Sequence, residues 1–170
     1  MKKKIPSRIY LIGFMGSGKS TLGKQLAKKL RFNFFDTDDA LEKKQRMKIK
    51  NIIKKKGMKE FKEMEKEIFL QTITMEQIVI STGGGLPAYK DNITKMKRAG
   101  LVIWLKPSVE ELAKRLRKHK SGRPLVAKIN DEDLPFFISM LMRKRIKYYR
   151  RAHVKIENDK ISVKKIMESI

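Results

Sequence analysis

The sequence predicts an α/β fold built around a parallel β-sheet. Two observations support this class: short apolar runs alternate with longer helical stretches, and a glycine-rich phosphate-binding pattern joins the first run to the first helix. The length of 170 residues is enough to bury a sizeable core and favours one domain, residues 1–170.

The expected strands are short runs rich in β-branched or aromatic residues, and the expected helices fill the intervals between them. We expect strands at 9–12, 34–35, 78–80, 101–105 and 154–156. We expect helices near 19–29, 39–46, 59–74, 91–98, 108–118 and 131–149, and a last one from about 162 to 170. Ser108 is a suitable N-cap because two glutamates follow it, and Gly100 is a suitable stop for the preceding helix.

The net charge is the most unusual number in the composition. Lys and Arg number 42 against 18 Asp and Glu, which gives a formal charge of +24. Such an excess can indicate a protein that binds nucleic acid or anionic lipid. Here it is spread over both halves of the chain and consists mainly of lysine, so we expect a general surface bias and no nucleic-acid groove. Met1 to Lys4 are expected to form a lysine tail before the first strand.

The lack of cysteine and the lack of a long apolar run exclude further classes of protein and of site. The chain contains no cysteine, which excludes a disulfide scaffold, a thiolate metal site and a cysteine nucleophile. No apolar run reaches the roughly 18 residues of a membrane-spanning helix, so we expect no membrane partner. We therefore expect a cytoplasmic protein.

A phosphate-binding loop is the strongest motif in the sequence. Residues 13–21 read G-F-M-G-S-G-K-S-T and match G-x-x-x-x-G-K-[ST], between an expected strand and an expected helix. Glycines let backbone N–H groups surround phosphate oxygens, and the helix N-terminus adds partial positive charge. Lys19 would place a cation on the β- and γ-phosphates, and the Ser20 hydroxyl would ligate Mg²⁺. The chain is therefore expected to bind a nucleoside triphosphate.

Two carboxylates follow the second expected strand, where they would face the crevice at the carboxyl edge of the sheet. Asp36 could hold a water bound to Mg²⁺, and Asp38 could orient an attacking hydroxyl or accept its proton. The alternative is that Asp38 or Asp39 caps the next helix. The residues alone leave both roles open.

Three weaker features lie further along the chain. Glycines 83–85 follow the third expected strand and would either let a substrate approach backbone N–H groups or form a flexible turn. Arg123, within G-R-P-L, would either close over phosphates as a lid or belong to a solvated basic loop. Arg145, near the end of a helix and followed by Tyr149, would either contact an anion or lie on a solvated helix face.

Together these motifs resemble those of the shikimate kinase family. G-F-M-G-S-G-K-S-T, F-x-D-T-D, S-T-G-G-G, G-R-P-L and R-x-x-x-Y follow one another in the family's order, from about Arg8 to Ile170. The resemblance implies a P-loop kinase fold: a five-stranded parallel sheet with helices on both faces, in three α/β/α layers. It also implies substrate-binding helices at about 38–75 and a lid at about 118–130. The implied reaction is ATP- and Mg²⁺-dependent phosphorylation of the 3-hydroxyl of shikimate, in the pathway to aromatic amino acids.

The resemblance also implies a role for each site residue. The ATP-binding set would be Gly16, Ser17, Gly18, Lys19, Ser20, Thr21 and Arg123. The metal would be held by Ser20 and, through water, by Asp36. The shikimate-binding set would be Asp38, Lys62, Gly84 and Arg145. The catalytic residues would be Lys19, Asp38 and Arg123.

The substrate-binding half departs from the family pattern. The usual E-x-x-F-R reads M-K-E-F-K at 58–62, so Lys62 stands where an arginine would clamp the shikimate carboxylate. The acidic residue expected before I-F is absent at 50–53, and R-x-P-L-Y reads R-I-K-Y-Y at 145–149. Lysine supplies one charged hydrogen bond but no bidentate pair, and Glu65 could position it from one helical turn away. We therefore expect an active kinase with weakened affinity for shikimate.

Two other functions are compatible with parts of the sequence. Another small-molecule kinase of the same fold, such as a gluconate or nucleotide kinase, is favoured only by the Lys62 substitution. A nucleic-acid-binding protein of P-loop fold is favoured only by the +24 charge. We expect a monomer whose partners are ATP and shikimate and that binds no nucleic acid.

Overall fold

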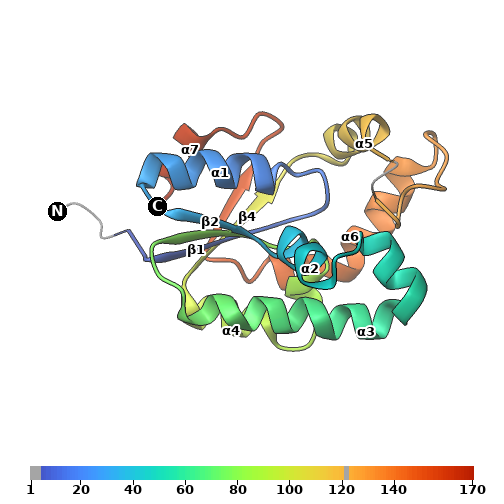
Figure 1. The fold of residues 1–170 in the computed structure, drawn as a ribbon. Coiled ribbons are helices and arrows are strands. Elements are labelled where there is room, and N and C mark those ends of the chain that lie inside the picture. Colours follow the sequence, from blue (N-terminus) through green and yellow to red (C-terminus); the bar gives the residue numbers. More distant parts are fainter. Residues whose placement is uncertain (1–4, 121–122) are drawn as a thin grey trace.

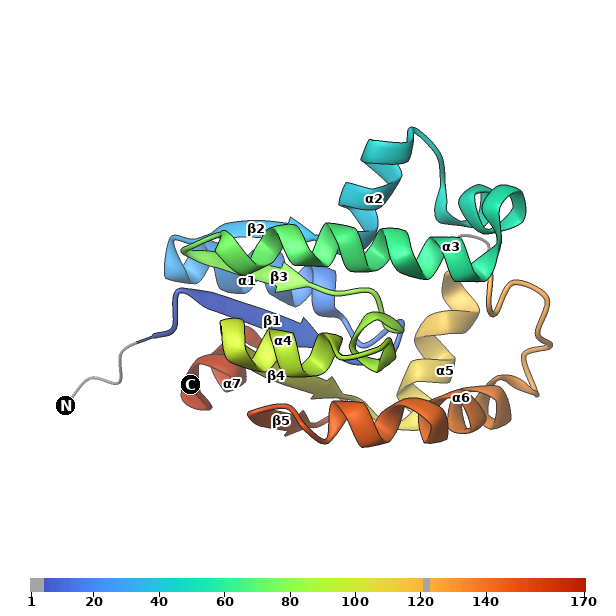
Figure 2. The same cartoon turned by 90° about the horizontal axis from the view of Figure 1, so that it is seen from below.

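A five-stranded parallel sheet organises the structure, a computed structural model that describes residues 5–120 and 123–170. The strands are β1 (Arg8–Ile12), β2 (Asn33–Asp36), β3 (Ile78–Ser81), β4 (Leu101–Lys106) and β5 (Val154–Glu157), and their order in the sheet is β2-β3-β1-β4-β5. Figure 1 shows the sheet between layers of helices, and Figure 2 labels all five strands. All four pairings between neighbours are parallel. Each strand expected from the sequence is confirmed, with every end displaced by at most one residue.

Seven α-helices lie in the described part of the chain. They are α1 (Lys19–Leu30), α2 (Thr37–Gln45), α3 (Ile49–Gln71), α4 (Asn92–Ala99), α5 (Val109–Lys118), α6 (Leu134–Tyr149) and α7 (Val163–Glu168). The N-cap at Ser108 is confirmed, since its side chain accepts a hydrogen bond from the backbone N–H of Glu111. No helix among the described residues is both long and apolar enough to cross a membrane.

Two expected helices have different bounds in the structure. Helix α3 begins well before residue 59 and passes through Gly57, where a φ of 82° and a ψ of 165° kink it. It also ends earlier than expected, because Thr72–Thr74 form a 3₁₀ turn. Helix α6 starts at Leu134 because 131–133 form a turn. Residues 1–4 of the expected lysine tail, Ser121, and Gly122, the first residue of the G-R-P-L motif, lie outside the described residues.

Helices cover both faces of the sheet and complete the three layers. On one face, Leu26 of α1 and Ile166 of α7 pack against the strands. On the other face, the strands meet Phe69 of α3, Met96 of α4 and Tyr149 of α6. Figure 2 shows α3, α4 and α6 along this second face. Because both faces are covered, the central strands β3, β1 and β4 are apolar without alternation, as is typical of parallel sheets, whereas the edge strand β5 alternates apolar and charged residues.

The carboxyl ends of the five parallel strands lie at the same end of the sheet (Figure 2). Two further apolar clusters pack the helices beyond these strand ends. Leu41 of α2 packs with Phe61 of α3 in one cluster. Phe14, in the loop after β1, packs with Leu116 of α5 and Ile138 of α6 in the other. The first cluster holds α2 against α3, and the second holds α5 against α6. Side chains from these two pairs of helices meet in the space between the clusters.

Candidate active site

The loop between β1 and α1 has the geometry of a phosphate-binding loop. Gly18 adopts a φ of 92°, a left-handed conformation that favours glycine, and it directly precedes the first turn of α1. The Lys19 side chain folds back over the loop, where its Nζ donates hydrogen bonds of 2.9 Å to the carbonyls of Gly13 and Phe14. Burial lowers the pKa of Lys19 to about 8, and the charges of Asp38 and Asp36 oppose that shift.

Asp36 links the phosphate loop to helix α2. Its Oδ2 accepts a hydrogen bond of 2.6 Å from the Ser20 hydroxyl, whose oxygen also lies 3.2 Å from that of Ser81. Its Oδ1 accepts hydrogen bonds from the backbone N–H groups of Asp38 and Asp39, so Asp36 is the N-cap of α2. The interpretation of Asp38 or Asp39 as the cap was therefore wrong. With Asp36 in that role, the Asp38 carboxylate faces the cavity.

Two buried carboxyl groups, those of Asp38 and Glu65, flank Gly83. Burial, reinforced by the charge of Asp36, raises the pKa of Asp38 to about 6. Burial and the charge of Asp38 raise the pKa of Glu65, on α3, to about 8. A Cβ atom at Gly83 would lie 2.7 Å from Oδ1 of Asp38 and would overlap Oε1 of Glu65. The first glycine of the G-G-G segment is thus required by the close approach of both carboxyl groups.

Two arginines present unpaired hydrogen-bond donors to the same region. In the described residues, the Nη1 atoms of Arg123 and Arg145 are buried and have no hydrogen-bond partner. Arg145 reaches from α6 over the ring of Phe14, at 5.5 Å from the ring centroid, and its Nη1 lies close to Gly84. The Nη1 of Arg123 lies close to Gly16 in the phosphate loop. Buried, unpaired guanidinium donors are suited to anionic ligands.

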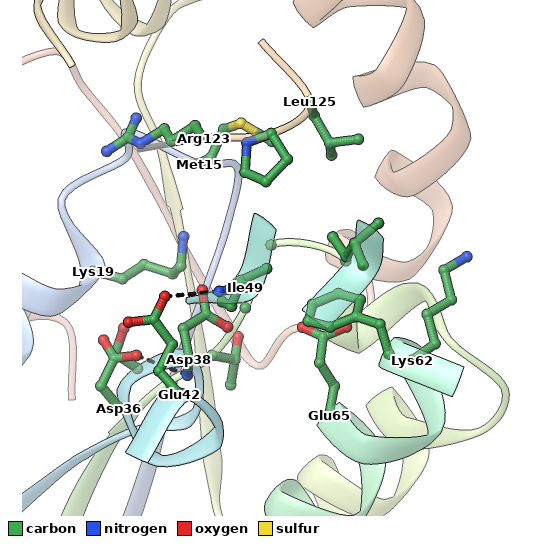
Figure 3. A pocket seen from close by; sticks show the side chains of 18 of the residues that line it. Met15, Lys19, Asp36, Asp38, Glu42, Ile49, Lys62, Glu65, Arg123 and Leu125 are labelled. Atoms are coloured by element: carbon green, nitrogen blue, oxygen red, sulfur yellow. Dashed lines mark hydrogen bonds between the residues drawn. The ribbon is translucent and has the colours of Figure 1, made fainter. Parts of the chain in front are cut away.

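Lys62 does not pair with Glu65 in the structure. No hydrogen bond or ion pair joins these two described residues, and the Lys62 Nζ lies over the ring of Tyr89, 5.6 Å from its centroid. The Tyr89 hydroxyl in turn donates a hydrogen bond of 2.5 Å to Glu63. Figure 3 shows the Lys62 amine directed away from Lys19, at the opposite end of the site. The aromatic ring, and not Glu65, therefore supports the lysine.

One cavity of about 250 Å³ is lined by residues from both the predicted ATP-binding set and the predicted shikimate-binding set (Figure 3). Those that line it are Gly16, Lys19, Ser20, Asp36, Asp38, Lys62, Gly84, Arg123 and Arg145. The remaining three, Ser17, Gly18 and Thr21, belong to the phosphate loop and the first turn of α1 without lining it. Residues that are up to 129 positions apart in sequence thus share one space, from Gly16 to Arg145.

The sequence reasoning missed Arg115 of α5, which ties three segments together. Its guanidinium donates to the carbonyl of Gly16 at 3.2 Å and to that of Asp159, after β5, at 2.7 Å. An ion pair with Glu111, at 2.6 Å, orients it. The four-residue spacing between Glu111 and Arg115 was the only signal in the sequence, and it predicts a helix-surface pair without indicating a contact to the phosphate loop.

The fold and the site together define a class of protein. A P-loop at the edge of a parallel sheet opens into a cavity that also contains a buried aspartate and two arginines with unpaired donors. This arrangement is that of a P-loop kinase acting on a small anionic molecule.

Comparison with known proteins identifies the family. The family model for shikimate kinase matches residues 15–170, and the chain belongs to the shikimate kinase family. It is 42% identical over 162 residues to the shikimate kinase of Sulfurihydrogenibium sp. (strain YO3AOP1), covering 95% of this chain and 94% of that protein.

Solved structures agree with this assignment. The crystal structure of shikimate kinase from Bacteroides thetaiotaomicron matches with a TM-score of 0.91 and 33% identity, covering 96% of this chain and 97% of that one. Shikimate kinase from Acinetobacter baumannii, in complex with shikimate, matches with a TM-score of 0.87 and 30% identity over 95% of this chain and 89% of that one.

Proposed function

We propose that this chain transfers the γ-phosphoryl group of ATP to the 3-hydroxyl of shikimate and releases ADP and shikimate 3-phosphate, in the pathway to aromatic amino acids. The observation that carries the proposal is the single cavity that joins Lys19 of the phosphate loop to Asp38 and Arg145. Membership of the shikimate kinase family, and the shikimate bound to the Acinetobacter baumannii relative, support the choice of acceptor.

The ATP end of the cavity supplies positive charge where phosphoryl transfer needs it. Backbone N–H groups of the loop and the N-terminus of α1 would surround the phosphates, and the Lys19 ammonium would leave the loop carbonyls for the γ-phosphate. Arg123 would add its unpaired Nη1 when the segment around it closes over ATP. Lys19 and Arg123 would thus neutralise the charge that is spread over the transferred group.

Mg²⁺ fits the oxygen atoms beside the phosphate loop. The Ser20 hydroxyl and the Asp36 carboxylate lie 2.6 Å apart, and hard oxygen donors of this kind suit Mg²⁺. Among the described residues, no group of three or more His, Cys, Asp or Glu side chains could hold a metal ion. Ser20 would therefore bind the ion directly and Asp36 through water, with ATP supplying further oxygens. The ion would supply charge neutralisation of the phosphates.

The other end of the cavity matches shikimate, a small polyol that carries one carboxylate. Asp38 would orient the attacking hydroxyl and accept its proton. Arg145 would grip the carboxylate, with Lys62 as a second cation and the Gly84 N–H as a further donor. Transfer then depends mainly on positioning, because phosphoryl transfer needs little covalent help from the protein.

A substrate panel tests the proposal. ADP release is measured with ATP and Mg²⁺ in the presence of shikimate, gluconate or nucleoside monophosphates. We expect turnover with shikimate, a large loss of kcat in Asp38→Asn and little change in Asp39→Asn, because Asp39 is exposed at the next position of the same helix. Preferential turnover of gluconate or a nucleotide would assign the chain to another kinase of this fold.

Three further properties complete the proposal. We infer that residues 1–170 form one domain, whose substrate-binding helices lie at about 38–75 and whose lid lies at about 118–130. The near-complete coverage of this chain and of its relatives supports a single domain. We also infer a cytoplasmic monomer that binds ATP and shikimate and neither nucleic acid nor membranes.

A further inference from the structure

Tyr149 closes a buried link between helix α6 and the glycine segment of the site. It is the last residue of α6, its side chain is fully buried, and its hydroxyl donates a hydrogen bond of 2.5 Å to the carbonyl oxygen of Gly84. Burial raises its pKa to about 12 against the opposing charge of Arg145, and the hydroxyl is a donor at neutral pH, as it would be at the ordinary tyrosine pKa of about 10. The motif R-x-x-x-Y contains this tyrosine, yet none of the steps assigned above uses it.

The spacing of that motif places Tyr149 one helical turn after Arg145, so both side chains leave the same face of α6. They reach the same segment of chain. Arg145 brings its Nη1 to within 3.3 Å of the position that a Cβ would occupy on Gly84, and Tyr149 holds the carbonyl of that residue. One helix thus presents a cation to the cavity and fixes the backbone beside it.

Gly84 lies in the turn after β3 and is oriented by contacts from other segments. With no side chain, a glycine has more accessible backbone conformations than any other residue, and its neighbours Gly83 and Gly85 share this freedom. The Tyr149 hydroxyl restricts one side of the Gly84 backbone, while the Thr37 hydroxyl accepts a hydrogen bond of 2.9 Å from the N–H of Gly83. A segment that must present an N–H to a ligand is therefore held at both ends.

We propose that Tyr149 is a positioning residue for shikimate, which holds the Gly84 backbone in register with the Arg145 guanidinium so that both contact one substrate molecule. The inference rests on the proposed function of the cavity and adds to it a residue that lies behind the site. Tyr149 acts through Gly84 and touches neither ATP nor the reacting atoms.

A comparison of two tyrosine-to-phenylalanine variants tests this role. Tyr149→Phe removes the hydroxyl and leaves the Gly84 carbonyl without its donor, and we expect a rise of about five- to tenfold in the KM for shikimate. The KM for ATP and kcat should stay within about twofold of the wild type, because the phosphate loop is untouched. Tyr10→Phe is the matched control: its hydroxyl is equally buried and pairs with Thr72 at 3.1 Å, away from the cavity.

Trp104 offers a second measurement, by fluorescence. It is the only tryptophan in the sequence, and its ring centroid lies 5.7 Å from that of Tyr149. Saturating shikimate should therefore change the intrinsic tryptophan emission of the wild-type protein, and the change should shrink in Tyr149→Phe.

The outcomes separate the two proposals. If the wild type does not phosphorylate shikimate, the proposed function fails, whatever the fluorescence shows. If the wild type is active, the role of Tyr149 is overturned by an unchanged KM for shikimate in Tyr149→Phe, or by an equal rise in both KM values. A wild-type emission that does not respond to shikimate also overturns it.

Discussion

Replacing Lys62 by arginine tests whether this residue contacts the carboxylate of the acceptor. Lys62 lines the cavity together with Arg145, and its amine rests on the ring of Tyr89, 5.6 Å from the centroid. An ammonium is a point charge, whereas a guanidinium offers two parallel donors to a carboxylate and stacks well on an aromatic ring. Lys62→Arg should therefore add one charged hydrogen bond without displacing the side chain from Tyr89.

The size of the expected fall in the KM for shikimate depends on how far water reaches the Lys62 side chain. A hydrogen bond to a charged group contributes about 1.5–3 kcal/mol when it is protected from water. Lys62 is only half-buried, so solvent screening reduces the gain to about 1 kcal/mol. Since 1.4 kcal/mol corresponds to a factor of ten, the KM for shikimate should fall about fivefold. The gain applies equally to the bound substrate and the transition state, so kcat should not change.

Steady-state kinetics at saturating ATP measure this change. Lys59→Arg is the matched control, because Lys59 lies on the same helix, is exposed and does not line the cavity. A KM for shikimate that is the same in Lys62→Arg and in the wild type would refute the reasoning, since it would mean that Lys62 does not reach the carboxylate. An equal fall in the KM for shikimate in Lys59→Arg would show that the effect does not depend on a contact inside the cavity.

Three further predictions follow from the structure. Asp38 must be ionised to accept a proton, so kcat/KM for ATP should fall below about pH 6. Lys19 must be charged to bind phosphates, so kcat/KM for ATP should also fall above about pH 8. A flat profile from about pH 5 to 9 would contradict both expectations. Gly83→Ala should lower kcat/KM for shikimate by about tenfold or more, because its Cβ would displace Asp38 and Glu65; an unchanged kcat/KM would contradict this. Binding to RNA, measured by fluorescence anisotropy, should be weak and lost above about 0.2 M salt, and tight binding above that concentration would reveal a nucleic-acid site.

The sheet and the phosphate loop could be predicted because local sequence determines them. The three central strands, β3, β1 and β4, are short apolar runs whose two faces are both buried, so they contrast clearly with the polar residues around them. The first half of α3 was not predicted, because its local sequence pattern is weak. In the segment 49–56 the helical spacing of Ile49, Ile52 and Ile53 spans only one turn before the lysine run and Gly57, and what anchors it is the packing of Ile52 with Leu41 of α2.

The sequence predicted which residues belong to the site, but not which contacts they make there. Sequence reasoning assigned Asp36, Asp38 and Arg145 to one site, and the structure brings them to one cavity. It could not foresee that Asp36 is the helix cap, since several nearby aspartates could take that role. Nor could it foresee the hydrogen bond between Tyr149 and Gly84, because nothing local relates residues 65 positions apart.

Glu65 and Lys62 illustrate the same limit. Their three-residue spacing on a helix predicts that they can touch. In the structure Glu65 is buried beside Asp38, while Lys62 turns to Tyr89, a partner supplied by the segment after the glycines. A contact that depends on how α3 packs against that segment cannot be derived from the sequence of α3 alone.

The central claim is that the γ-phosphoryl group of ATP passes to the 3-hydroxyl of shikimate in this cavity. Phosphorus NMR of a reaction containing ATP, Mg²⁺ and shikimate tests it most directly, because it reports both the consumption of ATP and the position of the new phosphate ester. We predict one ester, on the 3-hydroxyl, that forms with the wild type and is nearly absent with Asp38→Asn. Release of free phosphate without an ester, or an ester on another hydroxyl, would contradict the account.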